Sequence, residues 1–505
     1  MSISSFLNKS LVAAGTALLL AATSALAPAQ ERPDLVVGVA DLPATLEPGK
    51  ELSNVGTRVN YSVFDTLIRR DFLSAEGGGG SALVPGLATE WTRLDDMTLE
   101  VKLRDDVTFH NGAPLTAEDV VFTFSPERLS GENAVLSEGP AYFSVLAEVK
   151  AIDDHTVQFV TKAPDPLLEH RLSSWASWIV NKADWEAKAA TDGGIPMFPV
   201  GTGPFMLDEY KADESIRPVA FDGYFGGKPT AASVTFREIP EPSTRVAGLV
   251  SGEFDIITNV APDQIPQING YDDIETRSVV LANSHVLAYG TQDPVIKDAR
   301  IRRAMNLAID RNLLNEALWG GRAVVPNGHQ YPEFGDMYNP DHKGLQYDPE
   351  RAKELLAEAG YDGGLIKYTT QPNYYLNALP AARAIVEMWK AIGLNVELNV
   401  VESLSGLDMA TLRVRTGPIR PAIPIRSAVS GTSGGLSVAQ QRSAGNWAGT
   451  ENLERFNELG HIVESSVDLE TRRPAAFEML EIWEKDAPGT VLYQPLRNLW
   501  CIQGH

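Results

Sequence analysis

The chain has 505 residues, a formal net charge of −23, and 44% hydrophobic and 22% charged residues. This composition is typical of globular protein and excludes a disordered or fibrous chain, while the length predicts roughly two to four domains rather than one core. An acidic surface repels phosphate backbones and anionic lipid headgroups, so nucleic acid and direct membrane adhesion are not expected.

The first 29 residues have the features of a secretory signal peptide. Lys9 supplies a basic start, residues 11–22 form an apolar run, and APA at 27–29 provides a cleavage site before Gln30. The run is too short to span a bilayer. The mature chain is therefore expected to begin near Gln30 and to be exported.

Cysteine usage narrows the compartment. Cys501 is the only cysteine, so no disulfide can form within the chain and no cysteine follows the signal to carry a lipid. The sequence favours a periplasmic protein of a two-membrane bacterium that is not lipidated, and a monomer is expected.

A strand and then an amphipathic helix are predicted at the start of the mature chain. DLVVGV at 34–39 alternates and then becomes apolar, as a first strand does. Within 54–67, Val59, Val63 and Phe64 recur at helical spacing. The polar face of this helix carries candidate ligand-binding residues, namely Asn54, Arg58 and Tyr61.

Residues 83–124 are predicted to form a strand, a turn and a capped helix. Residues 98–103 alternate as a half-buried strand does, and Thr116 stands as the N-cap of a helix with acidic residues in its first turn. His110 lies beside the turn with no second ligand at metal-binding spacing, and we interpret it as a histidine that hydrogen-bonds its own turn. No metal site is predicted.

Three motifs carry a resemblance to a known family. LVPGLATEW at 83–91, KLRDDVTFHNGAPLTAEDVVFTF at 102–124 and GTGPFML at 201–207 closely resemble motifs of the extracytoplasmic solute-binding proteins of the peptide/opine/nickel class, solute-binding protein family 5. The resemblance runs from about residue 35 to about residue 495. It implies a carrier, with no catalytic residues and no cofactor, that delivers a small-molecule ligand to an ABC importer permease in the inner membrane.

The resemblance also implies the fold and its division. The expected fold is α/β, the two-lobed periplasmic-binding-protein fold of the cluster C type, with an extra small domain in the first lobe and a hinge between the lobes. The implied segments are the signal peptide at 1–29, the first lobe at 30–67, 198–288 and 483–505, the small domain at 68–197, and the second lobe at 289–482.

A pair of tryptophans follows a predicted hairpin. VKAIDDHTVQFV at 149–160 predicts two strands joined at Asp153-Asp154. Trp175 and Trp178 then lie three apart, on one face of a helix or at the lip of a loop. Aromatic faces line small-ligand clefts, but such pairs belong to protein cores equally often, so both residues are candidates with both roles open.

The middle of the chain contains the predicted crossing between lobes. Residues 245–257 predict a helix, a turn and a strand, and VVLANSHVLAYGTQ at 279–292 predicts a long strand. The resemblance implies that this strand passes between the lobes, which makes His285 and Tyr289 candidates for the wall of a cleft. A buried, hydrogen-bonded histidine is the more frequent role of such a residue.

Helical patterns open the second lobe. Residues 298–318 have apolar residues at helical spacing, and Asp348, Pro349 and Gly360 mark the two ends of a further helix. We interpret the arginines of the first segment as a solvated, salt-bridged face, namely Arg300, Arg302, Arg303 and Arg311.

Residues 367–402 predict a strand, a loop, a helix and a second strand. A connection of this length predicts that the two strands pair in parallel. Ligands of open α/β sheets bind at the carboxyl ends of strands. The loop therefore contributes candidate ligand contacts, namely Asn373, Tyr374 and Tyr375.

Residues 409–449 contain no Asp or Glu but several arginines. Peptide-binding members of the family commonly place there an Asp that pairs with the amino terminus of the ligand, so its absence weakens an ordinary peptide ligand. Guanidinium groups bind carboxylates through two parallel hydrogen bonds. The candidates in this segment are Arg420, Arg426 and Ser427.

Three classes of function remain to be weighed: a carrier, an exported hydrolase of unfamiliar geometry, and a chaperone-like peptide binder. No GxSxG, HExxH or Walker motif occurs in the sequence. The sequence therefore favours a carrier of a small carboxylate-bearing ligand, such as an opine-like conjugate or a short peptide, with a neutral oligosaccharide or a metal chelate as the alternative. The last segment, 486–505, resembles the family's return to the first lobe, where relatives usually continue further.

Overall fold

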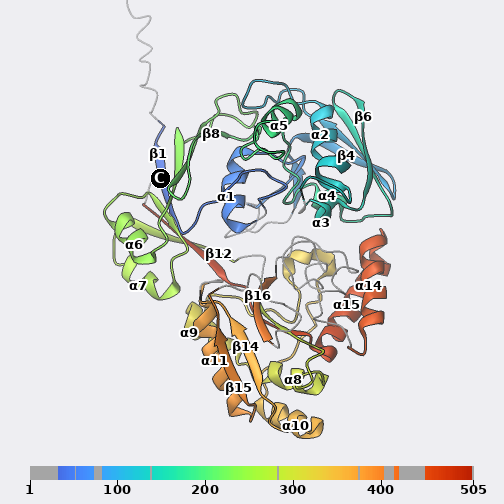
Figure 1. Cartoon of the computed structure of the whole chain (residues 1–505), viewed down its shortest axis with the longest axis vertical. Helices are drawn as coiled ribbons and strands as arrows, with labels where there is room; N and C mark the ends of the chain where they lie inside the picture. Colours follow the sequence, from blue (N-terminus) through green and yellow to red (C-terminus); the bar gives the residue numbers. More distant parts are fainter. Residues whose placement is uncertain are drawn as a thin grey trace, which may run out of the picture.

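Two separate β-sheets organise the chain, and Figure 1 shows that they lie in two lobes stacked along the long axis of the molecule. The computed structural model describes residues 32–51, 53–72, 82–136, 139–280, 284–372, 376–402, 414–419 and 450–502. The predicted signal peptide lies outside the described residues.

Lobe 1 is built on a mixed sheet of seven strands in the order β12-β18-β11-β1-β10-β9-β8. The central strand β1 pairs in parallel with β10 and β11, and the other neighbours pair in antiparallel. The strands are β1 Asp34–Val39, β8 Phe205–Lys211, β9 Ser215–Ala220, β10 Ser233–Glu238, β11 Ile256–Thr258, β12 Ile274–Val280 and β18 Leu496–Ile502. The helices are α1 Asn54–Val63, α6 Pro242–Val250, η2 Pro262–Gln264 and α7 Ile265–Ile268.

A four-stranded antiparallel sheet, in the order β4-β5-β7-β6, forms a separate part of lobe 1. The hairpin predicted over residues 149–160 is confirmed by β6 and β7. The strands are β4 Ala88–Asp95, β5 Thr98–Leu103, β6 Leu146–Asp153 and β7 Thr156–Thr161, with β2 Ile68–Arg70 and β3 Leu83–Pro85 paired beside them. The helices are α2 Ala117–Thr123, η1 Pro126–Ser130, α3 Pro140–Phe143, α4 Leu168–Arg171 and α5 Lys182–Ala189.

Lobe 2 contains a five-stranded sheet in the order β15-β14-β16-β13-β17. The predicted parallel pairing of β14 with β15 is confirmed. The strands are β13 Ser284–Tyr289, β14 Ile366–Thr370, β15 Val396–Val400, β16 Val414–Ile419 and β17 Gly489–Tyr493. The helices are α8 Ala299–Leu307, α9 Arg311–Trp319, η3 Pro332–Met337, α10 Pro349–Ala359, α11 Ala378–Ala391, α14 Leu453–Ser465 and α15 Leu469–Asp486.

The chain passes between the two large sheets twice, at neighbouring places. β12 and β18 pair in lobe 1 up to Val280 and Leu496, and β13 and β17 pair in lobe 2 from His285 and Tyr493. Both crossings are short, because residues 281–283 lie between β12 and β13 and residues 494–495 lie between β17 and β18. The predicted boundaries between the lobes, after residue 288 and before residue 483, remain proposals. Sheet membership instead favours boundaries at the two crossings.

Helix ends follow the predicted capping residues. Asp348 accepts a hydrogen bond from Arg351 N, and Gly360 ends α10 in the left-handed conformation with φ 67°. The segment 298–318 differs from a single helix. Asp310 accepts from Leu313 N at 2.9 Å and thereby starts α9 separately from α8.

The predicted solvated arginine face is wrong for Arg302, which is 1% exposed. Its guanidinium donates to the carbonyls of Asp486 and Ala487, and to those of Ile296 and Lys297 before α8. Arg300 instead pairs with Asp298 at the surface, as expected. A guanidinium with five donors can satisfy several carbonyl groups at helix ends at once, which the count of nearby charges does not reveal.

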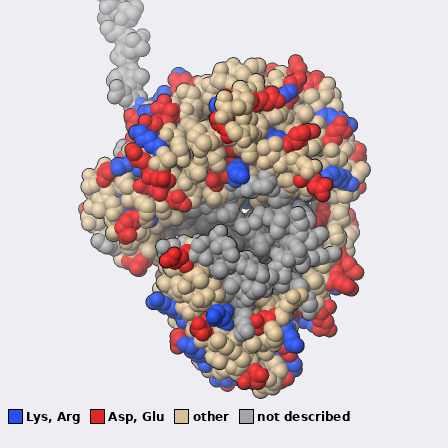
Figure 2. Space-filling view, viewed as in Figure 1, with Lys and Arg blue, Asp and Glu red and all other residues tan. Residues whose placement is uncertain are grey.

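Charged side chains of both signs are interspersed over the face of the molecule in Figure 2. No extended basic patch lies on the described part of that face, which agrees with the acidic balance of the sequence. Among the helices of the described residues, none is long and apolar enough to cross a membrane.

Candidate ligand-binding site

Helix α1 lies on the side of lobe 1 that faces lobe 2 (Figure 1). Ser53 caps it, because its hydroxyl accepts from Val55 N and Gly56 N, each at 3.1 Å. Arg58 is half-buried and donates to Thr258 Oγ1 at 3.3 Å, which ties α1 to β11. Asn54 is the first residue of the helix, and its side chain lies outside the described part of the structure.

Three aromatic rings meet beside α1. Tyr61 is 37% exposed and makes T-shaped contacts with Trp178 at 5.3 Å and with Phe72 at 5.7 Å between ring centroids. The guanidinium of Arg70 lies 5.2 Å from the centroid of Phe72. This cluster offers an aromatic surface together with a cation, which suits a ligand with both apolar and anionic parts.

A buried carboxylate fixes a second arginine next to this cluster. Asp65 is buried, pairs with Arg69 at 2.8 Å and accepts from Thr202 Oγ1 at 3.1 Å. Tyr224 donates at 3.4 Å to Oδ1 of Asp65, the oxygen that also pairs with Arg69. Burial raises the pKa of Asp65, and the charge of Arg69 partly offsets this rise. The Arg69 side chain is 39% exposed, so it is held from behind while its other side stays open.

Close backbone packing explains why Thr202 reaches Asp65. Gly203 N donates to Val63 O at 2.9 Å, and a Cβ on Gly201 would lie 2.2 Å from that same oxygen. Only glycine allows this approach, so the GTGPFML motif lies directly against the end of α1.

The two predicted tryptophans lie in a loop after α4, not on a helix. Trp178 is 1% exposed, and its backbone forms an isolated antiparallel β-bridge with Thr66. Trp175 is half-buried and packs against the hydrophobic cluster that contains Trp178. Ala176 between them has φ 63°, a left-handed conformation that costs energy in a residue other than glycine. Trp178 therefore supports the exposed ring of Tyr61 from inside the lobe.

In lobe 2, the two predicted wall residues are buried. His285 is 4% exposed and lies among Trp319 and Tyr493, at ring distances of 5.8 and 5.2 Å. Burial lowers the pKa of His285 to about 3, so the ring is neutral. Tyr289 is fully buried and its hydroxyl hydrogen-bonds that of Thr490.

The sequence predicts that the His110 side chain hydrogen-bonds its own turn. Its Nε2 instead lies 2.9 Å from the carbonyl oxygen of Gly203, to which it hydrogen-bonds. Burial lowers its pKa to about 4, so it is neutral there. Within the described residues no group of three or more His, Cys, Asp or Glu side chains is arranged to hold a metal ion.

The remaining predicted contacts lie outside the described residues and stay predictions, namely Asn373, Tyr374, Tyr375, Arg420, Arg426 and Ser427. Conversely, sequence reasoning does not single out Asp65, Arg69, Arg70 or Phe72. The run IRRDF at 68–72 was the available signal, since it places two arginines and an aromatic residue directly after the helix.

Comparison with known proteins gives a consistent result. The model of the family described as bacterial extracellular solute-binding proteins, family 5 Middle, matches residues 82–432. The dipeptide-binding protein of Escherichia coli strain K12 is 32% identical over 345 residues, which are 64% of this chain and 64% of that protein. The matched stretch thus spans less than two thirds of that relative.

Solved structures share the fold over nearly the whole chain. The DppA periplasmic binding protein from Helicobacter pylori, in complex with the peptide STSA, has a TM-score of 0.78 at 23% identity and covers 93% of both chains. NikZ from Campylobacter jejuni, in complex with Ni(L-His), has a TM-score of 0.78 at 18% identity and covers 94% of both chains. The predicted two-lobed α/β fold is therefore confirmed.

Proposed function

The chain belongs to the bacterial extracellular solute-binding proteins of family 5, and from this premise we propose that it is a periplasmic carrier rather than an enzyme. Its cargo is a small carboxylate-bearing solute, such as an opine-like conjugate or a short peptide. The loaded carrier docks on an ABC importer permease in the inner membrane. Export through the predicted signal peptide brings the chain to that compartment.

The paired crossings between the sheets carry this proposal. Only residues 281–283 and 494–495 separate the strands of one lobe from those of the other. Such short neighbouring connections allow rigid lobes to rotate about one axis, which is how hinge closure operates. A ligand that contacts both lobes binds the closed form more tightly and shifts the population toward it.

The described wall of lobe 1 supports a carboxylate-bearing ligand. Arg69 is held by Asp65 with its outer side open, and Arg70 lies over Phe72 beside the exposed ring of Tyr61. Two oriented guanidinium groups next to aromatic faces match a carboxylate attached to an apolar or ring-bearing body. Arg420 and Arg426 remain further proposals for the same carboxylate.

Calorimetry against a panel of short peptides, opines, neutral oligosaccharides and nickel chelates tests the proposal. We expect tight one-to-one binding of a member that carries a carboxylate. Replacing Arg69 or Arg426 by Ala is expected to weaken that binding by about 2–5 kcal/mol if the arginine forms a desolvated pair with the ligand. Binding of neutral sugars alone would contradict the proposal that the ligand carries a carboxylate.

A metal chelate is the second candidate ligand. The observation in its favour is that NikZ, which shares this fold over 94% of its length, has been solved with Ni(L-His). A chelate of that kind contains a carboxylate, so the arginines alone do not distinguish the two. Calorimetry with L-histidine in the presence and absence of nickel does so, since a chelate ligand requires the metal.

A further inference from the structure

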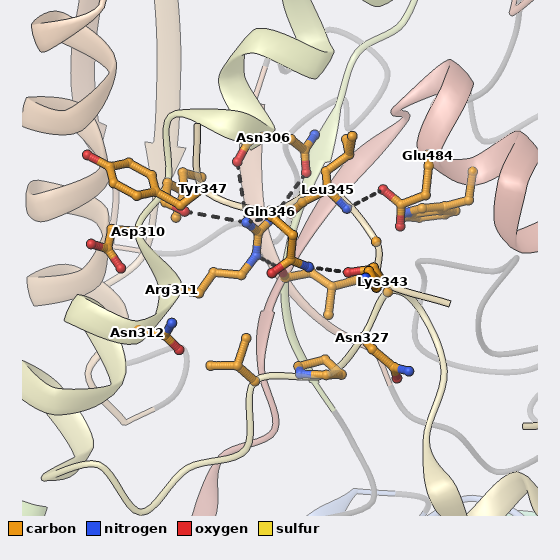
Figure 3. A pocket seen from close by; sticks show the side chains of 17 residues that line it. Asn306, Asp310, Arg311, Asn312, Asn327, Lys343, Leu345, Gln346, Tyr347 and Glu484 are labelled. Atoms are coloured by element: carbon orange, nitrogen blue, oxygen red, sulfur yellow. Dashed lines mark hydrogen bonds between the residues drawn. The ribbon is translucent and has the colours of Figure 1, made fainter. Parts of the chain in front are cut away.

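A polar cavity lies in lobe 2 between α9 and α15 (Figure 3). Its volume is about 230 Å³, and Val491 of β17 and the loop at 325–328 form part of its wall. Arg311 reaches it from the start of α9, and Glu484 reaches it from α15. None of the predicted ligand contacts lines this cavity.

The guanidinium of Arg311 is anchored at one end and loosely bound at the other. Its Nε donates to Val491 O at 2.7 Å, whereas the contacts of Nη1 and Nη2 with Asn306, Ile309 and Leu345 are 3.3 to 3.4 Å long. Good N–H to O hydrogen bonds are shorter, about 2.9–3.0 Å. Nη1 already has three carbonyl acceptors, whereas Nη2 has only the side-chain oxygen of Asn306. Nη2 therefore retains a donor for a stronger acceptor such as a carboxylate.

Glu484 offers the opposite chemistry. One carboxylate oxygen accepts from Leu345 N at 3.1 Å, and the other lies 3.6 Å from His342 Nε2, beyond hydrogen-bond distance. Its side chain is 18% exposed, and its negative charge acts on Arg311. The second oxygen can accept from an ammonium group.

The charges of the wall balance. Arg311 and Lys343 are cationic, and Asp310 and Glu484 are anionic. Lys343 has no ion-pair or hydrogen-bond partner for its ammonium group among the described residues. A purely anionic ligand meets two carboxylates here and a purely cationic ligand meets two cations, so the best match has separated charges and no net charge.

We propose that this cavity is a second binding site, specific for a free α-amino acid as the zwitterion. Arg311 and Lys343 receive its carboxylate, Glu484 receives its ammonium group, and the amides of Asn312 and Gln346 are available to its side chain. The side chain is neutral and small enough for the cavity. This site is independent of the ligand proposed for the space between the lobes.

The position of the site links it to the crossing between lobes. Val324 and Gln494 exchange two backbone hydrogen bonds, at 2.8 and 3.2 Å, directly before the loop that lines the cavity. Gln494 lies in the crossing segment after β17. An occupant that contacts this loop and Val491 holds both segments together. The backbone amide hydrogens of Val324 and Gln494 are then expected to exchange more slowly with solvent.

The test uses the mature wild-type protein with L-serine, L-glutamine, succinate and putrescine as probes in calorimetry, together with hydrogen exchange by mass spectrometry. We expect one of the amino acids to bind and to slow exchange in peptides that cover residues 320–347 and 489–496. Succinate, which has no ammonium group, and putrescine, which has no carboxylate, are expected not to bind there. Protection of these peptides by putrescine or by succinate would overturn the proposal. The absence of protection by both L-serine and L-glutamine at millimolar concentration would also overturn it.

Matched variants on α15 complete the experiment. Glu484→Gln keeps an acceptor for Leu345 N but removes the negative charge. It is expected to weaken binding of the amino acid at least tenfold. Glu481→Gln changes an exposed carboxylate on the same helix and is expected to leave the affinity unchanged. Equal affinities of the two variants would overturn the assignment of Glu484.

Discussion

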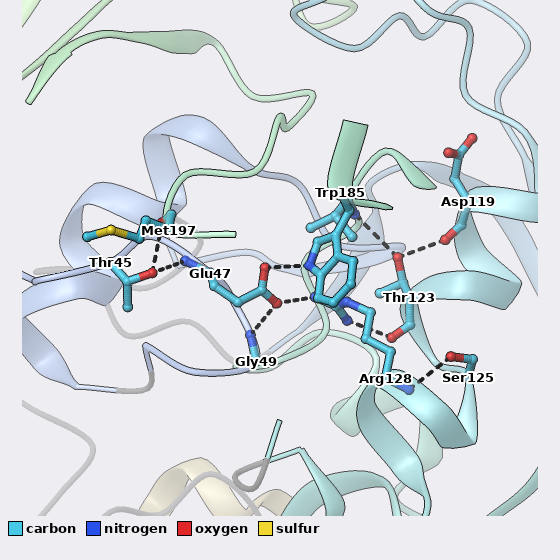
Figure 4. Close-up of polar contacts among 10 residues, drawn as sticks. Thr45, Glu47, Gly49, Asp119, Thr123, Ser125, Arg128, Trp185 and Met197 are labelled. Carbon is cyan, nitrogen blue, oxygen red and sulfur yellow. Dashed lines mark hydrogen bonds and ion pairs between the residues drawn. The ribbon is translucent and has the colours of Figure 1, made fainter. Parts of the chain in front are cut away.

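At the scale of single residues, Glu47 and Arg128 form a buried ion pair between the loop before α1 and η1 (Figure 4). Glu47 also accepts from Trp185 Nε1 at 3.0 Å and from Gly49 N at 3.3 Å, while Arg128 donates to Thr123 O at 2.7 Å. Burial raises the pKa of Glu47 and lowers the pKa of Arg128. Desolvation thus opposes both charges, and the pair fixes the position of the loop more than it stabilises the fold.

This pair gives the first prediction. Arg128→Met leaves an unpaired carboxylate in the core and is expected to lower the free energy of unfolding by about 3–5 kcal/mol. The double variant Glu47→Leu with Arg128→Met removes both charges and is expected to regain most of that loss. Urea denaturation at pH 7 measures both. A double variant as unstable as Arg128→Met alone would contradict the account.

A second prediction concerns acid stability. His329 is 1% exposed, its ring stacks edge-on against Trp483 at 4.4 Å, and neither ring nitrogen has a hydrogen-bond partner among the described residues. Burial lowers its pKa to about 3. Because the unfolded chain binds the proton near pH 6.5 and the folded chain does not, stability is retained above about pH 6.5 and lost as the pH falls toward 3.

His329→Phe is therefore expected to reduce the loss of unfolding free energy between pH 7.5 and pH 5 by about 2 kcal/mol. His155→Phe serves as the control, since His155 is exposed on the β6–β7 turn. Urea denaturation at the two pH values checks the difference. An unchanged pH dependence in His329→Phe would show that this histidine is not the group responsible.

At the scale of elements, α15 of lobe 2 faces α4 of lobe 1 across the space between the lobes (Figure 1). Arg472 on α15 is half-buried and donates to Val463 O at 3.1 Å. Burial lowers the pKa of Arg472, and the charge of Asp165 on the other lobe partly offsets this, while Arg93 adds to it. The attraction to Asp165 acts between the lobes, and it is weakened because Asp165 also pairs with Arg171 at 2.7 Å.

Arg472→Met is accordingly expected to accelerate ligand dissociation, by up to about fivefold, because an attraction that involves a partly exposed charge contributes no more than about 1 kcal/mol. Arg473→Met is the matched control, since Arg473 donates to Asp336 O within lobe 2 at 3.0 Å. Stopped-flow dissociation kinetics compare the two variants. Equal rates in both would rule out a contribution of Arg472 to closure.

Elements with local signals were predictable from the sequence. The caps of α10 lie at Asp348 and Gly360, and the alternation over residues 98–103 gives β5, because these patterns depend only on neighbours in the chain. The division into α8 and α9 at Asp310 was not predicted, since apolar spacing continues through it. Arg302 was misjudged because its carbonyl partners lie up to 185 residues away.

The candidate site was predictable only in part, for the same reason. Of the candidates on the polar face of α1, Tyr61 lies in the aromatic cluster and Arg58 hydrogen-bonds Thr258 of β11. The support of Arg69 depends on Asp65, Thr202 and Tyr224, which come from three segments that only the folded chain brings together. Periodicity carries no information about such a junction.

At the scale of the whole molecule, hinge closure requires two lobes joined by two short neighbouring crossings. Val280 pairs with Leu496 in one sheet, and His285 pairs with Tyr493 in the other, so both connections lie beside one another. A rotation about this pair moves α15 toward or away from α4 without disturbing either sheet. The proposed carrier function requires that the ligand drive this rotation.

Small-angle X-ray scattering with and without saturating ligand tests this claim most directly, using the ligand that calorimetry identifies. The radius of gyration is expected to fall on saturation because the lobes approach. An unchanged radius of gyration with confirmed tight binding would contradict hinge closure as the mechanism.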